Sequence, residues 1–233
     1  MGLNVVVGFA EDLIDDEEGQ AWFAEQVAAA NAALARAGLP TWEEPDDVEP
    51  RSFEMYGYSG LHTLRRVAAH LREHGRVPPP LGRDEASPDD ATLAKVYAAG
   101  PAHGVTSRKR LGRVKVQRHG TPTPTAFDHV VHHSDAEGFY APVDFAPVLQ
   151  DSTVVGGFVG AAPRLLAECR DLAAALGIDP EADPDSEEVF NAVEAQVQHP
   201  QGWQLYAVET FTCLQLIRAS QAALATGAAL VFS

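Results

Sequence analysis

The spacing of apolar residues along the chain predicts several amphipathic helices. After an acidic stretch that ends at Glu18, apolar side chains recur every three or four positions at Phe23, Val27, Ala30 and Leu34, the spacing of one helix face. Three further segments have a helical spacing, and each is followed by glycine, the usual residue just past a helix end: 60–74, 163–176 and 203–226. Two shorter helices are expected, one before Gly100 and one after Ser186.

Short runs of β-branched and aromatic residues predict strands. Valine-rich runs lie at Leu3–Phe9 and near the C-terminus at Ala229–Phe232. Residues 113–118 alternate valine with basic or polar side chains, which is typical of a strand. Residues 127–145 hold two aromatic and β-branched arms around the loop 134–138, which contains serine, aspartate and glycine, and this pattern predicts a β-hairpin.

These elements predict an α+β fold in one globular domain that spans residues 1–233. We expect five to six helices to pack on a small mixed sheet that includes the 127–145 hairpin. A doubly wound parallel sheet is the alternative, but the chain has too few alternations of strand and helix to favour it.

The charge of the chain is strongly negative and unevenly distributed. The net charge is −16, from 17 basic and 33 acidic residues. The window from Arg65 to Arg118 holds 12 basic and 5 acidic residues, a net of +7, so the remainder carries −23. A surface this acidic repels nucleic acid and favours a basic protein as partner. A GC-rich genome or a salt-adapted surface would explain the same composition without any partner.

The 127–145 segment contains the densest group of side chains that could act in catalysis or bind a metal, namely histidines and carboxylates. His133 could act as a general base, oriented by Asp135 or Asp144. A metal site is the second interpretation, with His129, His132, His133 and Asp135 as candidate ligands, although zinc would need a further ligand from elsewhere in the fold. A third interpretation is structural, in which Ser134 and Asp135 shape the turn and the histidines bond to the backbone. No motif in the sequence predicts a particular cofactor.

A basic segment precedes the expected hairpin and is the candidate anion-binding site. Its cations, together with an aromatic of the hairpin, form the expected binding set: Arg108, Lys109, Arg110, Arg113, Lys115 and Tyr140. These cations could hold a phosphate or a carboxylate. No aromatic residue lies between Tyr97 and Phe127 to stack on bases, which disfavours nucleic acid. The favoured interpretation is a charged edge strand or hairpin that resists aggregation or pairs with the acidic remainder of the chain.

The sequence indicates a cytoplasmic protein. No apolar run is long enough to span a membrane, and the N-terminus lacks the pattern of a signal peptide. Cys169 and Cys213 fall on apolar helix faces, where buried reduced thiols are expected. Nothing in the sequence predicts an oligomeric state.

Two hypotheses of function follow. The first is an acidic binding or interaction protein, in the manner of an antidote to a basic partner. The second is a small hydrolase or transferase at the 127–145 hairpin, with or without a metal, in which cations of residues 108–118 would hold an anionic substrate.

Overall fold

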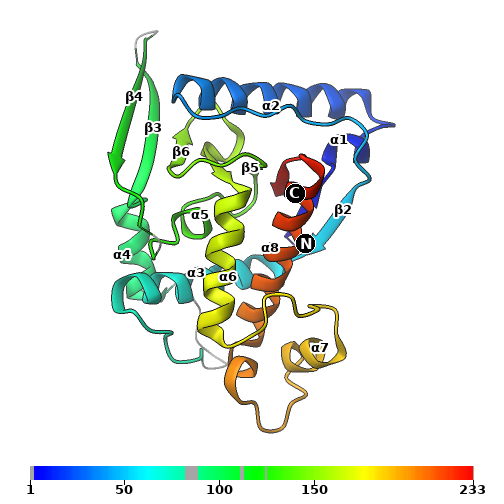
Figure 1. Ribbon diagram of the computed structural model, residues 1–233, viewed down its shortest axis with the longest axis vertical. Coiled ribbons are helices and arrows are strands. Elements are labelled where there is room, and N and C mark those ends of the chain that lie inside the picture. The colour runs from blue at the N-terminus through cyan, green and yellow to red at the C-terminus, as the bar shows by residue number, and fades with distance from the viewer. Residues whose placement is uncertain (1–2, 82–88, 111–112, 124, 233) are drawn as a thin grey trace.

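One mixed β-sheet organises the fold. The computed structural model describes residues 3–81, 89–110, 113–123 and 125–232. The sheet has eight strands in the order β2-β1-β8-β5-β7-β6-β3-β4 (Figure 1). The strands are β1 (Asn4–Val7), β2 (Arg51–Glu54), β3 (His103–Arg110), β4 (Arg113–Gly120), β5 (Gly138–Ala141), β6 (Val148–Asp151), β7 (Phe158–Ala161) and β8 (Leu230–Phe232).

Helices cover both faces of this sheet. The described α-helices are α1 (Phe9–Asp12), α2 (Glu17–Arg36), α3 (Gly57–His74), α4 (Ala91–Ala99), α5 (Asp128–Val131), α6 (Ala162–Leu176), α7 (Glu187–Val193) and α8 (Ala207–Thr226). Two 3-10 helices, η2 (Val155–Gly157) and η3 (Gly202–Tyr206), complete the set. The prediction of an α+β fold is therefore confirmed, but the sheet is larger and the helices more numerous than the sequence indicated.

The sheet separates two hydrophobic cores. Phe139 of β5 and Val231 of β8 pack in a core with Phe23 and Leu34 of α2. Tyr140, which follows Phe139 on β5, packs in the other core, to which α3, α6 and α8 contribute side chains. Because successive side chains of a strand point to opposite faces, this division makes a three-layer arrangement, with α2 on one side and α3, α6 and α8 on the other (Figure 1).

The pairing of the strands leaves β2 and β4 at the two ends of the sheet. Parallel pairs occur between β5 and β7 and between β3 and β6. The other neighbours are antiparallel, including the long hairpin of β3 and β4 and the pair of β2 with β1. Each end strand therefore has one side without a neighbouring strand in the described sheet, and these two sides lie at opposite ends of the molecule.

The helices follow the local patterns of the sequence. The Asp16 carboxylate caps α2 by accepting the N–H of Gly19 at 3.0 Å, and Gly75 and Gly227 end α3 and α8 in the left-handed conformation. Cys169 of α6 and Cys213 of α8 are buried and free. None of the described helices combines the length and the apolar character that crossing a bilayer requires.

The predicted hairpin at 127–145 is wrong. Its first arm is the short helix α5, and its second arm includes β5, which pairs with β7 and β8. The carboxylate of Glu168 on α6 accepts the backbone N–H groups of His129 and Val130, at 3.2 and 2.8 Å. Glu168 thus satisfies amide groups of the first turn of α5, as a capping side chain would.

The loop after α5 is held by a buried arginine. Arg65 of α3 is 1% exposed. Its Nε donates to the carbonyl of Val130 at 2.8 Å, its Nη2 donates to the carbonyl of His133 at 2.9 Å, and its Nη1 pairs with Asp135. These bonds turn the chain between α5 and β5 into a loop held against the middle of α3, so residues 127–133 cannot extend as a strand.

Gly160 allows the ring of Tyr140 to lie against the neighbouring strand. A Cβ atom at position 160 would collide with the Cδ1 and Cε1 atoms of Tyr140. Tyr140 is 1% exposed, and its hydroxyl donates to the carbonyl of His129 at 2.7 Å. The ring therefore has no free space into which it can move.

Replacement of Gly160 by alanine is expected to lower the free energy of unfolding by about 1–3 kcal/mol, because the new methyl group overpacks the core. Urea unfolding would measure the loss. The matched comparison is the same replacement in a Tyr140→Leu background, where the cost of Gly160→Ala should be smaller by at least about 1 kcal/mol. Equal costs in the two backgrounds would contradict the proposed contact.

Candidate functional site

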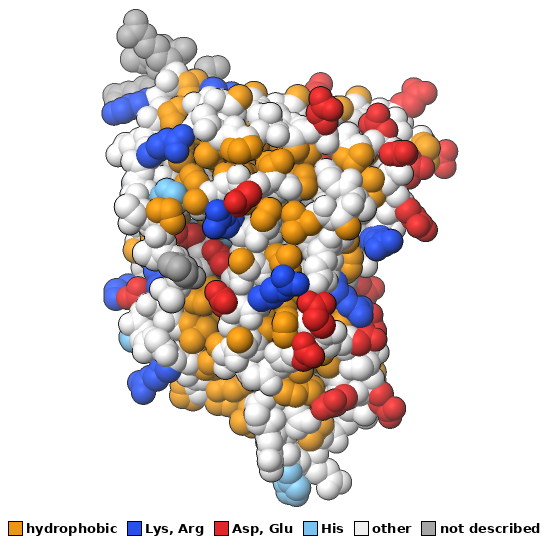
Figure 2. Space-filling view, viewed as in Figure 1, with side chains coloured by type: hydrophobic (Ala, Val, Ile, Leu, Met, Phe, Trp, Pro, Cys, Tyr) orange, Lys and Arg blue, Asp and Glu red, His pale blue; other side chains and the backbone are white. Residues whose placement is uncertain are grey.

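The two ends of the sheet carry opposite charges. Residues 11–54, which include β2, contain thirteen acidic and two basic residues. At the other end, residues 103–120, which form the β3–β4 hairpin, contain six basic and no acidic residues. Figure 2 shows acidic side chains gathered along the side of the molecule where Figure 1 places α1, the start of α2 and β2. The charge asymmetry of the sequence is therefore a spatial one.

The acidic side is built from three segments of the chain, which we call the acidic edge. Its members are the exposed carboxylate side chains of residues 15–18, 43–54 and 179–188. They are Asp15, Asp16, Glu17, Glu18, Glu43, Asp46, Asp47, Glu49, Glu54, Asp179, Glu181, Asp183, Asp185, Glu187 and Glu188. Within the described structure, ion pairs with arginine occur at Glu181, Asp183 and Asp185. Most of these carboxylates are thus solvated and not neutralised by the protein itself.

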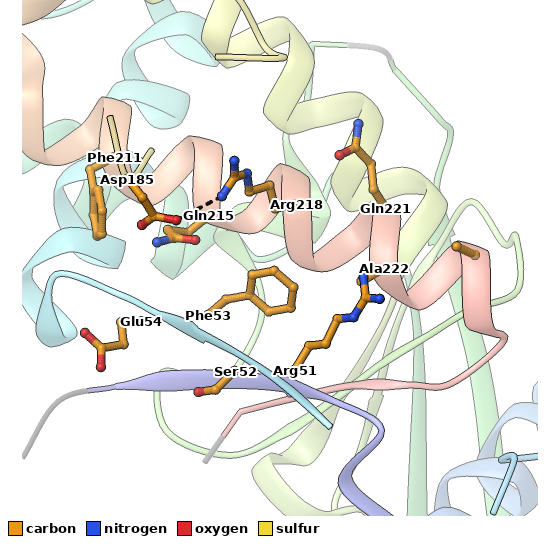
Figure 3. A pocket seen from close by; sticks show the side chains of 11 residues that line it. Arg51, Ser52, Phe53, Glu54, Asp185, Phe211, Gln215, Arg218, Gln221 and Ala222 are labelled. Atoms are coloured by element: carbon orange, nitrogen blue, oxygen red, sulfur yellow. Dashed lines mark hydrogen bonds and ion pairs between the residues drawn. The ribbon is translucent and has the colours of Figure 1, made fainter. Parts of the chain in front are cut away.

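A groove of about 840 Å³ joins two of these segments. Strand β2 forms one wall and α8 the other, and Asp185 lies at its rim (Figure 3). Phe53 points from β2 toward α8, as does Arg51. Arg218 of α8 turns instead to the acidic segment, donating to Asp185 at 3.0 Å and to Asp183 at 2.6 Å.

A second groove of about 690 Å³ is lined by Glu43 and Asp46 of the second segment and by Ile14 and Gln20, which flank the first. Ala10, Glu11 and Phe23 line it from α1 and α2, and Trp42 and Asp46 line it from the following stretch. Trp42 is held in place by Asn31, whose side-chain amide accepts the N–H of Trp42 at 3.0 Å and donates to its carbonyl at 2.9 Å. The acidic edge therefore borders two grooves: one joins its second and third segments, and the other runs from its second segment to the residues that flank the first.

One acid near this edge differs from the rest because it is largely buried. Burial raises the pKa of Glu44, although hydrogen bonds from Trp42 and from the N–H of Ala229 lower it in part. Its Oε2 accepts those bonds at 2.6 and 2.9 Å. Glu44 therefore ties the acidic segment to Ala229, the residue before β8, and does not count among the exposed carboxylates.

The three residues predicted as catalytic do not form a hydrogen-bonded unit. His133 is buried with its ring stacked on Tyr140, and its Nδ1 and Nε2 lie 3.2 and 3.0 Å from the carbonyl oxygens of Ser134 and Phe139. Asp135 pairs with Arg65 and with His62, at 3.1 Å from the latter. Both nitrogens of His133 thus face the backbone and neither faces a carboxylate.

The third predicted catalytic residue, Asp144, lies on the surface. Its carboxylate accepts two bonds from Arg164, at 2.6 and 3.0 Å. Burial lowers the pKa of His133 to about 4, which favours a neutral ring in the folded protein. The arrangement agrees with the structural interpretation of His133, in which the ring bonds to the backbone.

The candidate metal ligands also lie in separate environments. His129 is fixed by the carbonyl of Ala146 at 3.1 Å and by the N–H of Ala161 at 3.1 Å, and burial lowers its pKa to about 4. His132 lies 3.5 Å from Arg72, and burial together with that arginine and Arg65 lowers its pKa to about 3. Among the described residues, no three His, Cys, Asp or Glu side chains are grouped so that they could hold a metal ion.

The predicted anion-binding residues lie in two places. Arg108 of β3 and Lys115 of β4 are exposed and directly opposite each other. Lys109, Arg110 and Arg113 lie on the same strands, but their side chains are outside the part of the structure that is described. Tyr140 is not with them: it is buried under β7, and burial raises its pKa above the usual range.

The sequence analysis did not find the acidic edge as a site. The signal was present, because residues 179–194 contain seven acidic and no basic residues, and residues 11–54 are nearly as biased. The pattern did not reveal β2, which is a four-residue strand with an unpatterned sequence, Arg51–Glu54. Without β2, the two acidic regions could not be placed beside each other.

Comparison with known proteins gives one match. A family described as "Putative DNA-mimic protein" matches residues 1–232 of the chain. Neither a curated protein nor a solved structure matches it.

This match corrects the functional prediction. A DNA mimic is a binding protein, which fits the acidic interaction protein of the first hypothesis in its general form. It does not fit the hydrolase or transferase of the second hypothesis. The positions of His133, Asp135 and Asp144 are in accord with this correction, because the described contacts engage each of them in packing or surface ion pairs.

Proposed function

Because the chain belongs to the DNA-mimic family that its sequence matches, we propose that its acidic edge takes the place of DNA on a basic, DNA-binding protein. DNA offers a dense row of negative charges, and proteins that bind it neutralise them with lysine and arginine. A protein surface with closely spaced, solvated carboxylates can be bound by the same cations. The partner is then prevented from binding DNA.

The observation that carries this proposal is the continuity of the acidic edge along one side of the molecule. Fifteen exposed carboxylates come from three segments. One groove joins the second and third segments, and the other is lined by Glu43 and Asp46 and by residues that flank the first segment. The cationic β3–β4 hairpin lies at the opposite end of the sheet, which leaves the acidic edge free of most compensating charge. Such a field attracts a basic partner and aligns it before contact.

Neutralising one acidic segment should weaken binding to that partner. The variant Asp46→Asn/Asp47→Asn/Glu49→Gln removes three charges from the middle of the acidic edge. We expect immobilised wild-type protein to retain a DNA-binding protein from an extract of the source cells, and the variant to retain at least about tenfold less of it, because several charge contacts are lost. Duplex DNA added in excess should release the retained protein.

The matched control removes the same charge elsewhere. Glu137→Gln/Asp144→Asn/Asp171→Asn changes three exposed acids outside the acidic edge, and it should retain the partner as the wild type does. Equal losses in both variants would indicate a general effect of net charge and count against the acidic edge. A retained protein that binds this chain and duplex DNA simultaneously would contradict DNA mimicry.

A further inference from the structure

Two cations of the β3–β4 hairpin face each other across the two strands. Arg108 and Lys115 are directly opposite in the antiparallel register, and both are exposed. Like charges directly opposite across two strands destabilise the pair. In the part of the chain that the structure describes, no carboxylate lies within ion-pair distance of either residue, although the chain has 33 acids.

Three further polar side chains surround this pair on the same face of the hairpin. The register places Thr106 opposite Gln117, two residues along from Arg108 and Lys115, and places His119 opposite Gly104. All five polar side chains line a hollow of about 270 Å³. Gly104 is part of this arrangement, because a Cβ atom there would collide with the His119 ring.

The opposite face of the same hairpin packs against the core and the end of α2. Val105 is fully buried in the core under α2, and Val116 packs against that core. Arg118, which shares their face, donates to the carbonyl of Ala37 at the end of α2. The hairpin is therefore anchored through one face and presents Arg108 and Lys115 on the other.

We propose that this face of the β3–β4 hairpin is a phosphate-binding site, formed by Arg108 and Lys115 with Thr106, Gln117 and His119. A phosphate group carries up to two negative charges and three strong acceptor oxygens. Two opposed cations match that charge, and the hydroxyl, amide and imidazole groups supply further donors. A single carboxylate has one charge and two oxygens, so it would leave part of this set unused, whereas two adjacent phosphodiesters of a nucleic-acid backbone, with one charge each, would engage both cations.

The acidic edge does not prevent anion binding at the hairpin. Seven strand spacings separate β2 from β4 in the sheet order, which is about 34 Å at about 4.8 Å each. The Debye length at physiological ionic strength is about 8 Å. The negative charge of the acidic edge is thus largely screened at the hairpin, where Arg108 and Lys115 set the local potential.

Calorimetric titration of the full-length protein with inorganic phosphate and with a twelve-nucleotide single-stranded DNA tests this site. We expect Arg108→Ala/Lys115→Ala to weaken binding at least about tenfold, since hydrogen bonds to charged groups are lost. For the oligonucleotide, two phosphate contacts predict a slope of log K against log salt near −1.4 in the wild type, and a slope near zero in the variant.

The control keeps the charge change and moves it away from the hairpin. Lys95→Ala/Arg170→Ala also removes one lysine and one arginine, both exposed and each paired with a glutamate. Binding of both ligands assigns the site to a nucleic-acid backbone, and binding of inorganic phosphate alone assigns it to a small phosphate compound; either result supports the proposal. The proposal is overturned if neither ligand binds, if glutamate binds equally well, or if the control variant loses as much affinity.

Discussion

Replacement of Arg65 by alanine is expected to lower the free energy of unfolding by about 3–5 kcal/mol, because two backbone carbonyls each lose a charged donor, at about 1–3 kcal/mol each, and a large buried side chain is removed. Arg65 is 1% exposed and is bound to Asp135 and to the carbonyls of Val130 and His133. Without the guanidinium, these carbonyls lose their donors and Asp135 loses one of its two side-chain partners, Arg65 and His62. The loop between α5 and β5 would then lose the contacts that shape it.

Urea unfolding followed by circular dichroism would measure this loss. Arg65→Lys should recover only a small part of it, because an ammonium group cannot reproduce the planar fork that reaches three acceptors. Arg76→Ala is the control: Arg76 is exposed just beyond the end of α3, so its replacement should change stability by less than about 0.5 kcal/mol. A loss below about 1 kcal/mol in Arg65→Ala would show that the buried network is not needed.

Acidification is expected to destabilise the protein between about pH 6.5 and pH 4. Burial lowers the pKa of His129 and His133 to about 4 and, with nearby arginines, that of His132 to about 3. An unfolded histidine titrates near 6.5. In this window the unfolded chain therefore binds more protons, and the stability that these groups contribute above pH 6.5 is lost as the pH falls through their folded pKa values.

Glu168 acts in the opposite direction. Burial raises its pKa to about 8, so its contribution to stability is present below about pH 4.5 and is lost as the pH rises toward 8. Three histidines and one glutamate leave a balance of about two protons in favour of the unfolded state near pH 5. This balance corresponds to roughly 2.7 kcal/mol of unfolding free energy per pH unit, at about 1.36 kcal/mol for each proton.

Urea unfolding at pH 7, 6 and 5 would test this dependence. His132→Gln removes one of the three histidines and should reduce the slope by about 1 kcal/mol per pH unit, whatever its own effect on stability. His199→Gln, at an exposed position between α7 and η3, should leave the slope unchanged. Equal stability at pH 7 and pH 5 would contradict the neutral, buried state of these histidines.

The acidic edge and the cationic hairpin could be predicted from the sequence only in part. The net of +7 between residues 65 and 118 and of −23 elsewhere already indicated a bipolar molecule. These net charges do not indicate that Asp185 lies near β2. Glu54 and Asp185 line the same groove between β2 and α8, although they are far apart in the sequence. The opposed pair of Arg108 and Lys115 likewise depends on the register of the hairpin.

The sequence by itself determined the long helices, because the signals that form a helix lie within it. Apolar spacing, the Asp16 cap and the terminal glycines act between residues at most a few positions apart, and α2, α3 and α8 end where those signals lie. It also determined the strands β1, β4 and β8, whose valines alternate or run together.

Only the tertiary structure decided the conformation of residues 127–141 and the order of the strands. The 127–133 segment has the composition of a strand, but Glu168 and Arg65, which lie 38 and 65 residues from Val130, bind its backbone groups and hold it as α5 and a loop. A hydrogen bond between distant residues has no local sequence pattern. The strand order that separates the acidic edge from the hairpin arises in the same way, from pairing between segments far apart in the chain.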